Sequence, residues 1–134
     1  MLETLSIMLV DDNEFDLFLQ QKFLENKKIA HKIEKYQFAN DALKFMESCN
    51  TEQMPDLILL DIHMPVTNGF KFLKLFGELP EDKTKNTSIV MVSSSIDAGD
   101  IKNASESPSV LKLLNKPLQV DLLISLLREK GVLK

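Results

Sequence analysis

Short apolar runs alternate along the chain with longer segments in which apolar residues recur every three or four positions. The first pattern is typical of buried strands and the second of amphipathic helices. Residues 57–60 are all aliphatic, as expected of a strand covered on both faces of a parallel sheet. Strands are predicted over residues 5–10, 31–38, 57–60, 88–93 and 109–115, the last of them stopped by Lys116-Pro117. The second of these alternates apolar and polar residues, which favours a place at the sheet edge.

Helices are predicted between and after these strands. Asn13 can cap the first of them, with Asp16 three residues further on. The apolar stripe of this helix is expected to consist of Phe15, Phe18, Leu19 and Phe23. Further helices are predicted over residues 40–49, from about 70 to 77, over 97–105 and over 120–131. The polar segment 78–87 is expected to be the longest loop, and 64–69 is rich in turn residues.

Five strands alternating with five helices predict an α/β fold, in which an open parallel sheet is wound on both sides. A chain of 134 residues has the size of one ordinary domain. It contains no internal repeat, low-complexity tract or linker. We therefore expect a single domain over residues 1–134, with its core at about 5–128.

Polar side chains follow the predicted strands at their carboxyl ends. Asp11 and Asp12 follow the first strand, Asp61 the third, Ser93 ends the fourth and Lys116 follows the fifth. In an open parallel sheet these ends share one edge, where ligands bind. A strand order of 2-1-3-4-5 would make strands one and three neighbours and bring the three carboxylates together. Ser93 and Lys116 would then lie on the other side of Asp61.

Three carboxylates beside one lysine leave an excess of negative charge, which raises a pKa or requires a cation. An all-oxygen ligand set without nearby His or Cys spacing favours Mg²⁺. The Ser93 hydroxyl and the Lys116 ammonium would suit a phosphoryl group, whose charge is stabilised by donors and cations. Asp61 is the central candidate for a carboxylate that forms an acyl phosphate, because it follows the middle strand.

Composition excludes several classes of function. The net charge of −4 and the pI near 5.2 do not fit nucleic-acid binding, which needs a basic face. No apolar run approaches the roughly 20 residues that span a bilayer. The first residues, MLETLSIMLVDD, lack the features of a signal peptide. Cys49 is the single cysteine, which fits a reducing cytoplasm. We therefore expect a cytoplasmic protein that binds neither DNA nor membranes.

From about Ile7 to Leu127 the sequence resembles the receiver domain of two-component response regulators, of the stand-alone, single-domain type. The motifs that carry this resemblance are the pair Asp11-Asp12, LLDIHMP with Gly69 following it, Ser93, and NKP at residues 115–117. Each motif is weak alone, but together they stand in order at the right strand ends. The resemblance implies a flavodoxin-like (βα)5 fold with the strand order 2-1-3-4-5.

In function, the resemblance implies that Asp61 is the phospho-acceptor. A sensor histidine kinase or phosphotransfer protein would supply the phosphoryl group, and the signal would pass to a downstream protein target. Ser93 would bond a phosphoryl oxygen and Lys116 would pair with it. The chain would not be an enzyme, since it would catalyse only its own phosphoryl transfer and autodephosphorylation.

The resemblance also implies a ligand set for Mg²⁺. Asp12 and Asp61 would bind the ion directly, together with the main-chain carbonyl of His63, and Asp11 would act through water. The ring of His63 could instead serve as a base or ligand, although one histidine does not make a metal cluster.

Leu113 departs from the family pattern, because many relatives carry Tyr or Phe three residues before the lysine. This puts the usual aromatic switch in doubt. The main alternative function is a degenerate receiver that is never phosphorylated and serves only as a protein-binding module. A flavodoxin-like flavin binder shares the sheet, but the acidic segment DDNEFD would repel its phosphate. The serine run 93–95 lacks the G-x-S-x-G elbow of a serine nucleophile.

Overall fold

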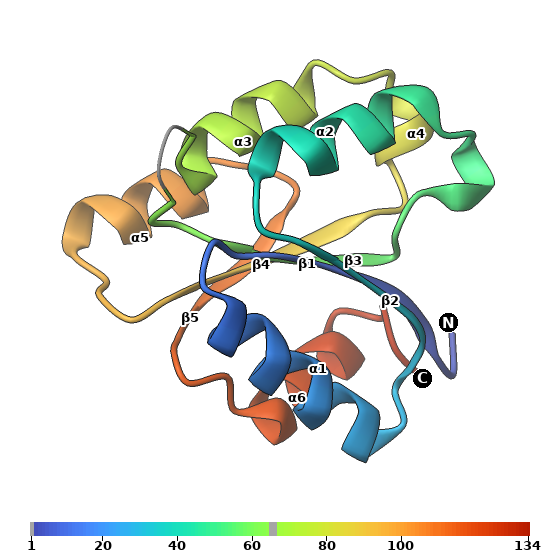
Figure 1. Ribbon diagram of the computed structural model, residues 1–134, viewed down its shortest axis with the longest axis vertical. Helices are drawn as coiled ribbons and strands as arrows, with labels where there is room; N and C mark the ends of the chain where they lie inside the picture. Colours follow the sequence, from blue (N-terminus) through green and yellow to red (C-terminus); the bar gives the residue numbers. More distant parts are fainter. Residues whose placement is uncertain (1, 65–66) are drawn as a thin grey trace.

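The computed structural model describes residues 2–64 and 67–134. Within these residues, five parallel strands form one sheet in the order β2-β1-β3-β4-β5 (Figure 1). The strands are β1 (Leu5–Val10), β2 (Ala30–Tyr36), β3 (Leu57–Asp61), β4 (Ser88–Ser93) and β5 (Val110–Asn115). The predicted fold class and strand order are therefore confirmed, and so is the position of the second strand at a sheet edge.

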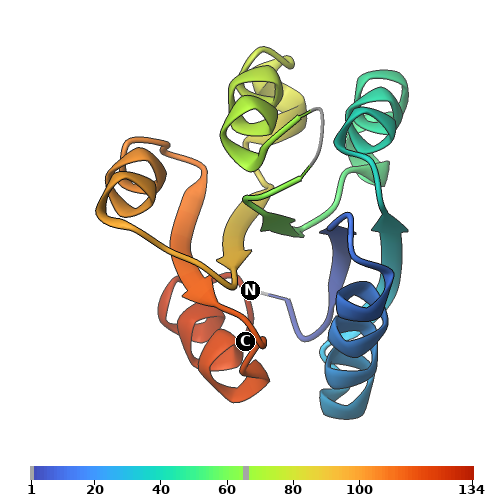
Figure 2. The same cartoon turned by 60° about the vertical axis from the view of Figure 1, so that its left-hand side comes forward.

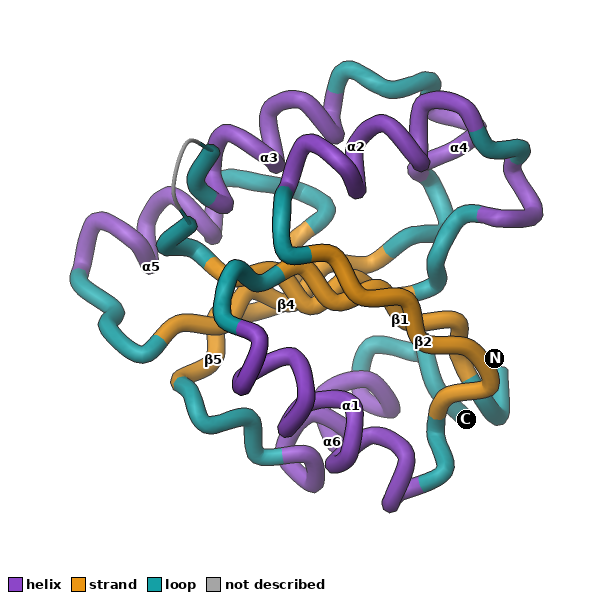
Figure 3. The backbone as a smooth tube through the Cα atoms, in the orientation of Figure 1, coloured by secondary structure: helices purple, strands orange, loops and turns teal. Residues whose placement is uncertain are grey.

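Helices cover both faces of the sheet. They are α1 (Glu14–Lys27), α2 (Ala39–Ser48), α3 (Gly69–Gly77), α4 (Glu81–Thr84), α5 (Ala98–Ser105) and α6 (Val120–Glu129), with a 3₁₀ turn, η1 (Thr51–Gln53). Helices α1 and α6 lie on one face, and α2, α3 and α5 lie on the other (Figures 1 and 3). This is the doubly wound arrangement that alternating strands and helices predict.

The strands divide their side chains between two apolar cores. Along β3, Leu57 and Leu59 pack on the side of α1 and α6, whereas Ile58 and Leu60 pack on the side of α2 and α3. All four are fully buried. Successive strand residues point to opposite faces, so a strand covered on both faces must be apolar at every position. This is why an uninterrupted aliphatic run precedes Asp61.

The predicted apolar stripe of the first helix is wrong. Phe15 and Phe18 are 65% and 51% exposed, and Phe23 is exposed as well. The residues that α1 buries are Leu17, Gln20 and Leu24. Both sets have helical spacing, so periodicity alone cannot choose between them. The set with the phenylalanines is the more hydrophobic, but the buried face of α1 is the one that contains Gln20, which lies near the carboxyl edge of the sheet.

The predicted loop at 78–87 contains a short helix, so the described residues form six α-helices rather than five. Helix α4 follows Pro80 and carries Glu81 and Asp82 in its first turn, where acidic side chains suit the helix dipole. The Lys83 ammonium donates to the carbonyls of Met46 and Glu47 at the end of α2. One turn is too short to produce a periodic apolar signal, and these contacts depend on tertiary structure.

The two ends of the described chain lie side by side, as Figure 2 shows. Leu2 and Leu133 pair as an isolated parallel bridge, and the backbone N–H of Lys134 donates to the carbonyl of Leu2 at 2.7 Å. Among the helices of residues 2–64 and 67–134, none combines the length and apolar character needed to cross a membrane.

Candidate functional site

Three carboxylates meet at the carboxyl edge of the sheet, as predicted. Val10, the last residue of β1, lies beside Leu60 of β3, so Asp11 and Asp12 come next to Asp61. One oxygen from each carboxylate lies within 4.8 Å of the other two. Asp11 is fully buried and Asp61 is 4% exposed, whereas Asp12 is the most accessible of the three. An all-oxygen group of this kind could hold a hard divalent cation.

Lys116 follows β5 and brings an ammonium group into the carboxylate cluster. Its backbone N–H donates to the carbonyl of Ser93 at 2.8 Å, which places Lys116 at the end of the neighbouring strand β4. Its Nζ lies 2.7 Å from Asp11 Oδ2 and 3.5 Å from Asp61 Oδ1. A further carboxylate, that of Asp16 in α1, accepts from the same Nζ at 2.9 Å. The Lys116 ammonium therefore forms ion pairs with the carboxylates of Asp11, Asp16 and Asp61.

Ser93 also lies at this edge, fully buried at the end of β4. Its hydroxyl donates to the carbonyl of Ser95 at 2.8 Å and accepts from the Ser95 N–H at 3.2 Å. The hydrogen bonds of the hydroxyl among the described residues thus stay within its own loop. To bond a group on Asp61, Ser93 would have to release Ser95.

His63 is exposed and lies two residues after Asp61. Its Nε2 lies 3.2 Å from the carbonyl oxygen of Ser95, the same oxygen that accepts from Ser93. Its ring does not join the three-carboxylate group found in the described residues. The expected role of its main-chain carbonyl stays a prediction. Pro65, the last residue of the LLDIHMP motif, lies outside the described residues.

Charge crowding changes the protonation behaviour of the site. Burial, followed by repulsion from Asp11, raises the pKa of Asp61 to about 7, although Lys116 partly opposes this. Burial alone would lower the pKa of Lys116, but its hydrogen bonds to Asp11 and Asp16 raise that pKa above its usual range. The lysine is therefore charged at neutral pH. The negative charges of the carboxylates still outnumber the single positive charge of Lys116, and a bound cation would offset the excess.

Two site residues were not predicted from the sequence as part of this cluster. The sequence indicates Asp16 only as part of the start of a helix, and no motif singles out Gln20. Gln20 is 3% exposed, and its Nε2 lies 3.5 Å from Asp11 Oδ2. Its Oε1 is buried and has no hydrogen-bond partner in the described part of the chain. Gln20 follows Asp16 by four residues within α1, a spacing that places both side chains on one side of the helix.

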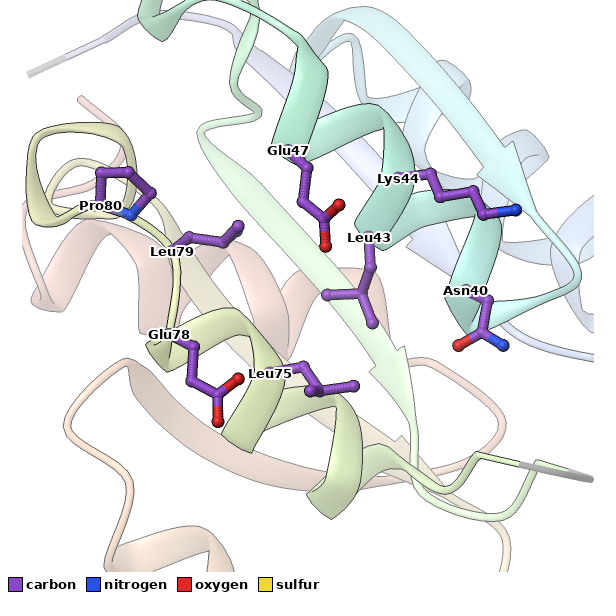
Figure 4. Close-up of a pocket in the computed structure, with 8 residues that line it drawn as sticks. All are labelled: Asn40, Leu43, Lys44, Glu47, Leu75, Glu78, Leu79 and Pro80. Atoms are coloured by element: carbon purple, nitrogen blue, oxygen red, sulfur yellow. The ribbon is translucent and has the colours of Figure 1, made fainter.

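Two hollows of the surface lie apart from this cluster. A hollow of 540 Å³ separates α2 from α3, and Figure 4 shows Leu43 and Glu47 projecting into it from α2. A groove of 360 Å³ runs along α5 and β5 and is lined by Ile101 and Leu113 among others. Neither includes a residue of the carboxylate cluster, so the chemistry of the site does not belong to either of them.

Comparison with known proteins connects this arrangement to a family. The family model described as "Response regulator receiver domain" matches residues 7–128. The solved structure of a response regulator receiver protein from Dyadobacter fermentans is similar, with 36% sequence identity and a TM-score of 0.84. The similarity covers 92% of this chain and 95% of that one.

Curated relatives are similar over much shorter shares of their own length. The sensory/regulatory protein RpfC of Xanthomonas campestris is 26% identical over 129 residues, which are 96% of this chain and 17% of RpfC. The hybrid signal transduction histidine kinase M of Dictyostelium discoideum is 31% identical over 124 residues, which are 92% of this chain and 5% of the kinase. The chain spans about a sixth or less of the length of these relatives.

Proposed function

The chain belongs to the response regulator receiver domain family, and from that premise we propose that Asp61 accepts a phosphoryl group in the presence of Mg²⁺. One observation carries the proposal. The Asp61 carboxylate lies beside those of Asp11 and Asp12 and 3.5 Å from the Lys116 ammonium. A receiver needs a carboxylate nucleophile in a site that attracts a cation and stabilises the spread charge of a phosphoryl group.

In the proposed reaction, an Asp61 carboxylate oxygen attacks the phosphorus atom of the donor. A new O–P bond forms, and the bond from phosphorus to the donor breaks. When the donor is a phosphohistidine, the electron pair of that bond stays on the imidazole nitrogen, which then takes a proton. When it is acetyl phosphate, acetate leaves. The attacking oxygen must be ionised, so Asp61 has to be deprotonated, although its pKa is raised.

Lys116 and Ser93 would act on the transferred group. The Lys116 ammonium would pair with one phosphoryl oxygen and offset part of its charge. The Ser93 hydroxyl would leave the carbonyl of Ser95 and donate to a second oxygen. Support for this comes from the placement of both residues at the ends of the two strands beyond β3.

Mg²⁺ is the proposed ion. Asp12 and Asp61 would bind it directly with the main-chain carbonyl of His63, and Asp11 would act through water. Once bound, Mg²⁺ would neutralise the charge that repels an incoming phosphoryl group. The donor set supports this choice because Mg²⁺ prefers oxygen ligands and uses only one or two carboxylates.

We also propose the setting in which this reaction takes place. The donor would be a sensor histidine kinase or a phosphotransfer protein, and the signal would pass to a downstream protein rather than to DNA. The similarity to a hybrid signal transduction histidine kinase supports such a donor, and the net charge of −4 supports the absence of DNA binding. The chain would act as one receiver unit in the cytoplasm and would catalyse only its own phosphoryl transfer and autodephosphorylation.

Phosphorylation with a small donor tests the central claim. Acetyl phosphate and Mg²⁺ should add one base-labile phosphoryl group to the chain, detected by intact mass, and a chelator should prevent the addition. Asp61→Asn should abolish it, whereas the control Asp82→Asn, on the exposed helix α4, should leave it unchanged. Labelling of Asp61→Asn at the wild-type rate would remove Asp61 as the acceptor. A wild-type chain that takes up nothing would favour the protein-binding module.

A further inference from the structure

The carboxylate of Asp16 does not make the local contact that its position predicts. Asp16 is the third residue of α1, and its N–H donates to the side chain of the capping residue Asn13 at 3.0 Å. An acidic side chain at this position commonly accepts from the capping residue's N–H in return, as Asp100 does from Asp97 in α5. In α1 the N–H of Asn13 donates instead to Asp11 Oδ1 at 3.0 Å.

Because Asn13 is already satisfied by Asp11, the Asp16 carboxylate can reach across to Lys116. The two atoms of this pair, Asp16 Oδ2 and Lys116 Nζ, lie 2.9 Å apart although the residues are 100 positions apart in sequence. The side chains are 29% and 13% exposed, so water and salt screen this pair less than a surface ion pair. Asp61 lies further from the same Nζ, at 3.5 Å.

The ammonium group has three N–H donors, and two of its contacts are short. Asp11 and Asp16 hold it at 2.7 and 2.9 Å. Asp61 has the longest of the three carboxylate contacts, at 3.5 Å, so Lys116 would have to shift away from one of its two short partners to pair closely with a phosphoryl group there. Asp11 is the less able to release it, because that carboxylate is fully buried. Asp16 is partly exposed, so water can replace the lysine there.

Resting on the function proposed above, we propose that Asp16 is a positioning residue that competes with the phosphoryl group for Lys116. In the unphosphorylated protein it holds the ammonium at 2.9 Å on the α1 side, which leaves only the longer contact of 3.5 Å to Asp61. On phosphorylation the ammonium moves to the phosphoryl oxygen, and Asp16 is left to water. Asp16 thereby slows phosphoryl uptake and weakens the phosphorylated state, acting only through the lysine.

A set of variants separates this role from a general effect of charge. Asp16→Asn keeps the backbone N–H that Asn13 caps but removes the charge that holds Lys116. Glu14→Gln is the matched control, because Glu14 is an exposed acidic residue of the same helical turn and makes no ion pair in the described residues. Asp16→Glu restores a carboxylate. Thermal melts of each variant establish that it is folded.

Uptake is measured as the rate of phosphorylation by acetyl phosphate with Mg²⁺, and affinity as the apparent Kd of beryllofluoride, a phosphoryl mimic. We expect Asp16→Asn to raise the rate and tighten beryllofluoride binding by about three- to tenfold, the range expected for a partly buried ion pair. Glu14→Gln should stay within about twofold of wild type, and Asp16→Glu should return towards it. In a Lys116→Met background, Asp16→Asn should have no effect, as a double-mutant cycle requires.

The outcomes are distinguishable. Equal rates and affinities for wild type and Asp16→Asn, in a wild-type protein that is phosphorylated, would overturn the role of Asp16 and leave the proposed function intact. The same gain from Glu14→Gln, or a gain that survives Lys116→Met, would also overturn it, because the effect would then be one of net charge. Failure of the wild type to take up a phosphoryl group or bind beryllofluoride would overturn both proposals.

Discussion

Gly69 packs against the backbone of Asp61, so that a Cβ on Gly69 would lie 2.7 Å from the Asp61 carbonyl oxygen. The same Cβ would meet Met91 Cε at 2.9 Å and Ile62 Cα at 3.0 Å. The N–H of Gly69 donates to the carbonyl of Ile62 at 2.8 Å. Only a residue without a side chain lets the start of α3 approach the end of β3 this closely. The position of Asp61 thus depends on a glycine that follows it in the next helix.

Gly69→Ala should therefore destabilise the protein, because two of the three clashing atoms belong to the backbone and cannot move aside. We expect a loss of about 2–3 kcal/mol in the free energy of unfolding, measured by denaturant titration. Gly77→Ala is the control, since its Cβ would meet no atom within 4 Å and alanine is the better helix former. That variant should be neutral or more stable by up to about 1 kcal/mol. Equal losses at both positions would contradict the close approach.

Mutual repulsion among the carboxylates should cost stability when no cation is bound. Asp12→Asn should relieve it and raise the metal-free free energy of unfolding by about 1–2 kcal/mol. Mg²⁺ should raise the melting temperature of the wild type by mass action and that of Asp12→Asn much less. Asp82→Asn should respond to Mg²⁺ as the wild type does. Asp12→Asn melting clearly below wild type in a chelator would contradict the clustered charge.

The raised pKa of Asp61 predicts a pH dependence of stability in metal-free protein. The folded protein binds this proton up to about pH 7, whereas the unfolded chain releases it near pH 4. Below about pH 4 the Asp61 carboxyl is protonated in both the folded and the unfolded state, so its titration does not change the free energy of unfolding. As pH rises from 4 to 7, the unfolded chain is favoured and stability falls.

Asp61→Asn removes this titration and isolates its effect. The stability gained by Asp61→Asn over wild type, measured in a chelator, should be greater at pH 8 than at pH 4.5 by roughly 2 kcal/mol. Taking the difference between two proteins cancels the titration of the carboxylates that lie away from this site. A difference that stays constant across this range would show that the pKa of Asp61 is not raised in the folded protein.

Phosphorylation should change the loop after β4 and the helix that follows it. Ser93 must release Ser95 to reach a phosphoryl group. Leu113, which stands where many relatives carry Tyr or Phe, lines the groove along α5. Hydrogen exchange with and without beryllofluoride and Mg²⁺ should therefore differ most over residues 94–113. Changes confined to α1 and residues 64–69 would place the output surface elsewhere. Asp61→Asn, treated in the same way, should show no change.

Sequence pattern alone determined the architecture and the centre of the site. Residues 57–60 had to be buried on both faces because all four are aliphatic, and that identified the central strand of a parallel sheet. Once such a sheet is predicted, its strands must end at a common edge, and the strand order 2-1-3-4-5 that the family resemblance implies makes Asp11, Asp12 and Asp61 meet there. The first inference uses the local pattern of apolar residues, and the second adds the order of the strands.

Only the tertiary structure decided which face of α1 is buried and what Asp16 contacts. Phe15 and Phe18 have the same helical spacing as the buried set, and the choice depends on how α1 packs against the sheet. The local partner of Asp16, the Asn13 N–H, donates to Asp11 instead, and Asp16 binds Lys116, 100 residues away. A contact between charges so far apart in the chain produces no periodic pattern in the sequence from which it could be predicted. Its energy comes from partial burial and from the other carboxylates around the lysine, which exist only once the sheet has formed.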